Sequence, residues 1–217
     1  MLIRSGEALG VGESRNMLYS GLNILPRSVF WSAYLNGRSD NADVIPPDHM
    51  HEMEHIGTEV VTERELYVLE IPTLADLPQA LDTAGKYSVI LTVSDATDFA
   101  TGEVFRFART LIDAGGVYFC PWGPGCDRIH DIIDEEWIGD GFVTANSPPP
   151  MTSLHNDDTL AEAVWFAIYS ASPNDAYIDE CRSVVAVCVR CPQWASEVRE
   201  AFSDPERFSD RVLGAGE

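Results

Sequence analysis

YSVILTVSDATD (residues 87–98) and GVYFCPWGPGCD (residues 116–127) each begin as an apolar strand and end in a polar turn. Between them, residues 102–114 repeat apolar side chains at the spacing of a helix that lies on a sheet. Further along, SVVAVCV (residues 183–189) is a continuous apolar run, as expected of a central strand covered on both faces. This alternation predicts an α/β fold in which right-handed crossovers join parallel strands.

The remaining elements extend this pattern. Strands are predicted at residues 65–71 and 141–145, helices at 126–137 and 159–171, and one or two helices after Pro192. We therefore predict a Rossmann- or flavodoxin-like, mostly parallel sheet of four or five strands flanked by helices, formed by residues 65–217. Residues 1–64 form a predicted N-terminal extension that is partly irregular, with a short helix at residues 28–35.

The charge of the chain is strongly one-sided. Its 35 acidic residues against 14 basic ones give a formal net charge of −21. We therefore expect neither nucleic acid nor an anionic membrane as a partner, because contacts with phosphate need lysine and arginine. A basic protein or a cation suits this field better. The alternative interpretation is that the acidic residues only keep the protein soluble.

Cysteine usage and hydropathy both favour the cytoplasm. Five cysteines, an odd count without framework spacing, fit reduced thiols. The first residues lack the apolar core of a signal peptide, and no apolar run approaches the length of a membrane span. We expect a cytoplasmic protein.

Two segments carry a resemblance to a known family. WGPGCDRIHD (residues 122–131) and MTSLHNDDTLAEAVWF (residues 151–166), followed by SVVAVCV, resemble small bacterial proteins of unknown function with a Trp-Gly…Asp-Cys stretch and a Met-Thr-Thr-Trp-His-type stretch ahead of an aromatic-rich helix. The resemblance covers roughly residues 65–200. This sequence departs from the pattern at Gly125, before Cys126, and at Leu154, before His155. The resemblance implies one α/β unit and assigns no catalytic residue.

Cys126 is the first candidate for catalysis. It follows a strand and opens a predicted helix, whose dipole lowers the pKa of a thiol and favours the nucleophilic thiolate. His155, with Asp157 beside it, is the candidate base from a later loop, and Asp127 completes the catalytic set. The resulting hypothesis is a thiol hydrolase. The alternative is a semi-buried cysteine with Asp127 as a helix cap.

A literal H-E-x-x-H occurs at residues 51–55. On a helix, this spacing places His51 and His55 on one face for Zn²⁺, with Glu52 as the general base. His49 is a further candidate ligand. The hypothesis is a zinc peptidase. The alternatives are a surface helix that binds Zn²⁺ or Ni²⁺ adventitiously and a polar turn of helix without a metal.

Acidic and aromatic side chains gather after the predicted strands. Because ligands of open parallel sheets bind beyond the carboxyl ends of the strands, these residues form the candidate ligand-binding set: Asp95, Asp98, Trp122, His130 and Asp157. The carboxylates could hold Mg²⁺, or they could cap helices and turns. We expect no cofactor, with Zn²⁺ and Mg²⁺ as the alternatives.

The function favoured by these observations is a non-catalytic binding or regulatory module, such as an immunity or adaptor protein, that acts on a basic protein partner. A thiol hydrolase that uses Cys126 and His155 is the first alternative. A zinc peptidase that uses the H-E-x-x-H segment is the second.

Overall fold

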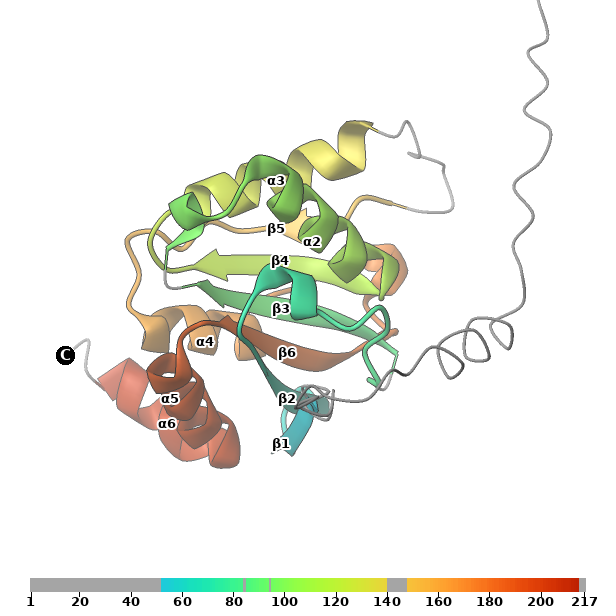
Figure 1. Ribbon diagram of the computed structural model, residues 1–217. Helices are drawn as coiled ribbons and strands as arrows, with labels where there is room; N and C mark the ends of the chain where they lie inside the picture. The colour runs from blue at the N-terminus through green and yellow to red at the C-terminus, as the bar shows by residue number, and fades with distance from the viewer. Residues whose placement is uncertain (1–51, 84, 94, 140–147, 215–217) are drawn as a thin grey trace, which may run out of the picture. The chain divides into compact units, whose positions relative to one another are not determined.

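The computed structural model describes residues 52–83, 85–93, 95–139 and 148–214, which lie in one compact unit spanning Pro47–Glu217 (Figure 1). Six strands form one sheet in the order β1-β2-β6-β3-β4-β5. β1 runs antiparallel to β2, and all other neighbours are parallel. The strands are β1 Glu54–Glu59, β2 Arg64–Ile71, β3 Lys86–Val93, β4 Gly116–Trp122, β5 Met151–Thr152 and β6 Cys181–Val189.

The predicted α/β class with a mostly parallel sheet is confirmed, but the sheet has six strands instead of four or five. β1 lies within residues 1–64, the predicted N-terminal extension, and pairs with β2 through a tight hairpin. Its sequence, EHIGTE, lacks the apolar alternation of a half-buried strand, so pairing with β2 decides its conformation. The predicted strand at 141–145 and the predicted helix at 28–35 lie outside the described residues.

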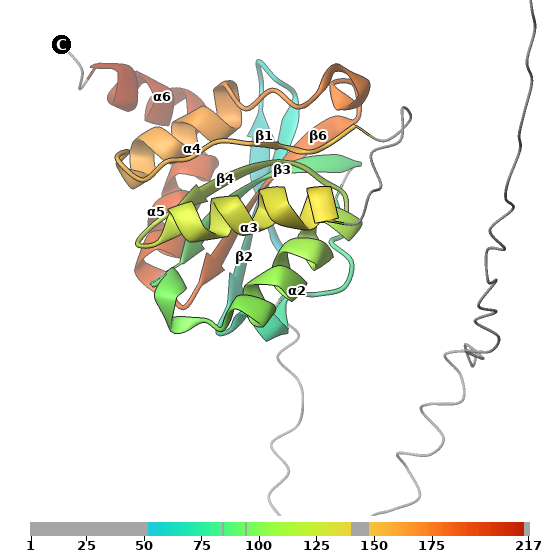
Figure 2. The same ribbon diagram turned by 90° about the horizontal axis from the view of Figure 1, so that it is seen from above.

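Helices cover both faces of the sheet. α2 (Thr101–Asp113) and α3 (Cys126–Gly139) lie on one face, whereas α4 (Leu160–Tyr169), α5 (Pro192–Ser203) and α6 (Pro205–Gly214) lie on the other (Figures 1 and 2). Among the described residues, no helix combines the length and the apolar composition that a membrane span requires.

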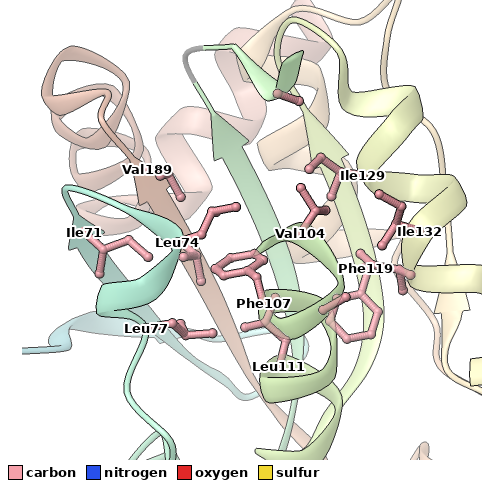
Figure 3. Packing of buried hydrophobic residues seen from close by; sticks show 14 of the residues in the cluster. Ile71, Leu74, Leu77, Val104, Phe107, Leu111, Phe119, Ile129, Ile132 and Val189 are labelled. Carbon is pink, nitrogen blue, oxygen red and sulfur yellow. The ribbon is translucent and has the colours of Figure 1, made fainter. Parts of the chain in front are cut away.

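The first face is packed by the apolar stripe predicted for residues 102–114. Val104, Phe107 and Leu111 of α2 point onto the sheet and meet Phe119 of β4 and Ile129 of α3 (Figure 3). Leu74 and Leu77, from the segment after β2, close the end of this cluster beside Phe107 (Figure 3). The predicted apolar stripe of α2 is therefore confirmed, and its packing holds α2 against this face of the sheet.

The central position predicted for SVVAVCV is also confirmed, because β6 lies between β2 and β3 with every residue from Ser183 to Val189 buried. Alternate β6 side chains enter opposite cores, with Val185, Val187 and Val189 on the α2 side and Val184, Ala186 and Cys188 on the α4 side. The chain reaches β6 from β5 through α4, on the face opposite α2 and α3. Because β3, β4, β5 and β6 are all parallel, the loops that follow them leave from the same edge of the sheet, at the carboxyl ends of the strands.

Candidate functional site

The carboxyl edge of the sheet gathers the loops that the sequence analysis singled out. Asp95 follows β3, Cys126 follows β4, and His155 follows β5. The amide of Ala96 donates a hydrogen bond to the carbonyl of Pro124, at 3.0 Å, so the first two loops are joined directly. A Cβ atom on Gly125 would lie 3.0 Å from the Cβ of Ala96, and Gly125 has a φ of +74°. Glycine therefore permits this close approach.

A cleft of about 520 Å³ opens where the β4 and β5 loops meet the start of α5. This rim cleft is lined by Trp122, Gly123, Pro124, Gly125, Cys126, Asp127, Asn156, Asp158 and Trp194. The rings of Trp122 and Trp194 meet edge to face, with centroids 4.9 Å apart. Trp122 Nε1 donates to the carbonyl of Asp158 at 2.8 Å, which fixes its ring against the β5 loop. Two indoles and two carboxylates therefore share one opening.

Cys126 stands at the first turn of α3 but is almost inaccessible, with an exposed fraction of 1%. Burial raises the pKa of its thiol, the nearby charge of Asp127 raises it further, and backbone amides that include that of His155 act in the opposite direction. The helix-dipole argument predicted a lowered pKa, and the structure gives the reverse because desolvation is the larger effect. The thiol is therefore protonated near neutral pH.

The imidazole of His155 makes two short hydrogen bonds inside its own loop. Nδ1 lies 2.7 Å from Oδ2 of Asp158, and Nε2 lies 2.7 Å from Oγ of Ser153. A carboxylate can only accept, so Nδ1 donates to Asp158. The hydroxyl of Ser153 lies between Nε2 and the Sγ atom of Cys120, which is 3.6 Å away. The ring is 4% exposed and meets Phe166 of α4 edge-on at 4.7 Å.

Ser153 was missed by the sequence analysis. Ser153 and His155 are two residues apart in an extended segment, which places their side chains on the same face. That spacing in MTSLH is the signal that could have identified the pair. The imidazole nitrogens of His155 are engaged by Ser153 and Asp158, whereas the predicted partner, Cys126, is approached by the His155 backbone amide.

The structure places the other predicted ligand-binding residues apart from this network. Asp95 caps a turn: its Oδ1 accepts from the amide of Thr97 at 2.8 Å and from the Thr97 hydroxyl at 2.7 Å, and these bonds lower the pKa of its carboxyl. Asp98 pairs with Arg190, which follows β6, at 3.2 Å. His130 lies on α3 beside Asp131, with 3.3 Å between Nδ1 and Oδ1. Asp157 is exposed in the β5 loop.

The helix that the H-E-x-x-H hypothesis requires does not form around His55, which lies in strand β1. Its Nε2 is 2.6 Å from Oε2 of Glu65 on β2, and its ring lies against Tyr67. His49 and His51 lie outside the described residues. Within the described ranges, no group of three or more His, Cys, Asp or Glu side chains is arranged to hold a metal ion.

Comparison with known proteins gives one match. The family model described as "Domain of unknown function (DUF7684)" matches residues 66–205. This range includes β4, β5, the Ser153–Asp158 loop and the start of α5, and therefore every residue that lines the rim cleft. No curated protein and no solved structure matches the chain.

Proposed function

The chain belongs to the DUF7684 family, a domain of unknown function, and we therefore propose a function from its own geometry. It is an acidic binding module, of the regulatory kind that immunity and adaptor proteins represent. Its rim cleft receives a cationic side chain of a basic partner. The carrying observation is the juxtaposition of Trp122 and Trp194 with the carboxylates of Asp127 and Asp158 in one cleft.

The chemistry of the cleft fits a lysine or arginine side chain. An indole attracts a cation through its ring, and this attraction is worth about 0.5–1 kcal/mol at exposed sites and about 2 kcal/mol when the pair is desolvated. A carboxylate supplies the opposite charge, and with arginine it can form a bidentate pair. The hydrogen bond from Trp122 to the Asp158 carbonyl holds the ring in place before a partner arrives, so less conformational freedom is lost on binding.

The net charge of −21 supports the same proposal at longer range. A strongly acidic surface raises the rate of encounter with a basic partner, and that advantage weakens as salt screens the charges. The predicted signature is therefore a complex whose association rate falls with ionic strength while the cleft contacts persist.

A titration of the full chain with a fluorescein-labelled arginine-rich peptide tests the proposal, with an equally long glutamate-rich peptide as the control. We expect binding of the basic peptide alone. Trp194→Leu and Asp158→Asn should each weaken it about tenfold, which is about 1.4 kcal/mol. Glu135→Gln removes an exposed charge from the far part of α3 and should leave the affinity within a factor of about two. Equal affinity for both peptides, or equal effects of Asp158→Asn and Glu135→Gln, refutes the proposal.

A second candidate function is favoured by the chain of hydrogen bonds through Ser153, His155 and Asp158. Its two distances of 2.7 Å and the order of its groups match those of a serine nucleophile, a general base and an orienting carboxylate. In that reaction Ser153 Oγ attacks an acyl carbonyl and its proton passes to Nε2, which then protonates the leaving group. Water subsequently hydrolyses the acyl-serine ester and restores Ser153. This candidate function takes Ser153, instead of Cys126, as the nucleophile of the hydrolase.

A fluorophosphonate probe separates the two candidates, because it forms a covalent adduct only with an activated serine. Intact-mass measurement should show one adduct on the wild-type chain and none on Ser153→Ala if the hydrolase function holds. An unmodified wild-type chain, under conditions that fully label a known serine hydrolase, leaves the hydrogen-bond chain with the role of bracing the β5 loop beside the rim cleft.

A further inference from the structure

Val60 and Val61 form an unusually exposed apolar pair. They sit in the turn between β1 and β2 with exposed fractions of 85% and 83%, the highest among the large apolar side chains of the described residues. Two adjacent valines that are exposed at a hairpin tip forgo the free energy that the burial of apolar side chains provides. Such an arrangement suits contact with another molecule.

The turn that carries the valines is held rigidly from beneath. Glu59 is 4% exposed, and its carboxylate accepts hydrogen bonds from the amides of Val61 and Thr62 and from the Thr62 hydroxyl. Burial alone would raise the pKa of the Glu59 carboxyl, but the bonds from Thr62 and Val61 lower it overall, so the group is charged at neutral pH. The valines are thus presented in a fixed orientation, and little backbone entropy remains to be lost when they bind.

Arg64, at the start of β2, anchors the other side of the hairpin. Its guanidinium donates to the carbonyl of Ile168 in the last turn of α4 at 3.3 Å and to that of Ala171, just after the helix, at 3.0 Å. This contact seats the hairpin against α4, next to Tyr169.

A groove of about 430 Å³ runs beside the exposed pair. This hairpin-tip groove is lined by Thr58, Glu59, Val60, Val61, Tyr169, Ser203, Asp204, Pro205, Glu206, Ser209 and Asp210. Four of these residues are acidic and none is basic. Burial raises the pKa of the Tyr169 phenol, and the charges of Glu59, Glu206 and Asp210 raise it further.

We infer that the hairpin-tip groove docks a polypeptide segment of the partner in which an apolar side chain is flanked by lysine or arginine. Val60 and Val61 would pack against the apolar side chain, while Asp204, Glu206 and Asp210 would pair with the flanking charges. The inference rests on the proposed function, since both require a basic partner, but it concerns a surface separate from the rim cleft. A second copy of this chain fits the groove poorly, because two molecules of charge −21 repel each other.

The test uses the full chain and a labelled synthetic peptide in which lysine alternates with leucine. Two matched peptides replace every lysine with glutamate or every leucine with serine. Fluorescence anisotropy should show tightest binding to the lysine–leucine peptide. Val60→Ser/Val61→Ser should weaken that binding at least about tenfold, as expected when a central apolar contact is removed. Ile178→Ser, a change of the same kind at a residue 52% exposed elsewhere, should change it less than about twofold.

The outcomes distinguish this inference from the proposed function. If Trp194→Leu and Asp158→Asn abolish binding while Val60→Ser/Val61→Ser leaves it unchanged, the rim cleft binds the partner and the inference about the groove is overturned. If the wild type binds none of the basic peptides at concentrations up to about 1 mM, both are overturned. Sedimentation velocity adds a further control: a wild-type dimer that Val60→Ser/Val61→Ser converts to a monomer assigns the groove to self-association and also overturns the inference.

Discussion

Replacing His155 with alanine should destabilise the fold substantially, because the imidazole braces the β5 loop from three directions. The hydrogen bonds to Ser153 and to Asp158 contribute about 1 kcal/mol each. The bond to the charged Asp158 contributes no more than the bond to Ser153, because the Asp158 side chain is 43% exposed and solvent screens the pair. The edge-on contact with Phe166 adds about 1 kcal/mol. We therefore expect a loss of about 3 kcal/mol in the free energy of unfolding, within the range measured for removing a buried ring.

Urea unfolding followed by circular dichroism measures this loss, and the slope m should stay unchanged, since a local loss of contacts leaves the surface exposed on unfolding nearly constant. Ser153→Ala is the matched control: it removes the bond to Nε2 and the 3.6 Å contact of the hydroxyl with Cys120 Sγ, but it keeps the contacts of His155 with Asp158 and Phe166, and it should cost about 1 kcal/mol. A loss below about 1 kcal/mol for His155→Ala, or equal losses for the two variants, would refute the bracing role derived from the structure.

Three further outcomes are expected. Glu59 has a pKa below its ordinary value of 4.5, so its contribution to stability is present above pH 4.5 and is lost as the pH falls through the folded-state pKa. In Glu59→Gln, the free energy of unfolding should therefore fall less steeply as the pH is lowered. An unchanged pH dependence contradicts the role of this carboxylate in the turn. The raised pKa of Cys126 predicts slow alkylation by iodoacetamide at pH 7.5 until urea unfolds the chain. Peptide mass mapping locates the modified thiol. Rapid modification of Cys126 in the native chain at that pH contradicts the prediction. Phe107→Ala should lower the free energy of unfolding by about 3–5 kcal/mol, because the Phe107 side chain is 2% exposed between α2 and the sheet. If its melting temperature changes no more than that of a variant with a substitution at an exposed position, the result counts against the packing in Figure 3.

The sequence predicts the parts of the fold that rest on local periodicity. The stripe on α2 and the apolar run of β6 identify a helix on a sheet and a central strand, because both patterns follow directly from burial. β1 escapes this reasoning because its residues are polar and its partner strand decides its conformation. β5 has only two residues, too few to show any period.

The candidate site is predictable to the extent that it lies at strand ends. Trp122 ends β4, Cys126 and Asp127 follow it, and all three line the rim cleft. Trp194 could not be placed there from sequence, since it arrives on α5 after the chain has returned through β6 to the middle of the sheet. The direction of the Cys126 pKa was also beyond sequence reasoning, because it depends on how completely the loops cover the thiol.

The central place of β6 has a consequence for synthesis on the ribosome. β2 and β3 each pair with β6, which is synthesised after both of them and after β4 and β5. Neither strand can complete its ladder until β6 has left the exit tunnel, so until then the nascent chain carries two apolar strands that each lack a partner. Ribosome-bound chains whose β6 segment is still inside the exit tunnel should depend on chaperones that shield these strands, whereas chains extended by a linker that brings Val189 out of the tunnel should release the chaperones.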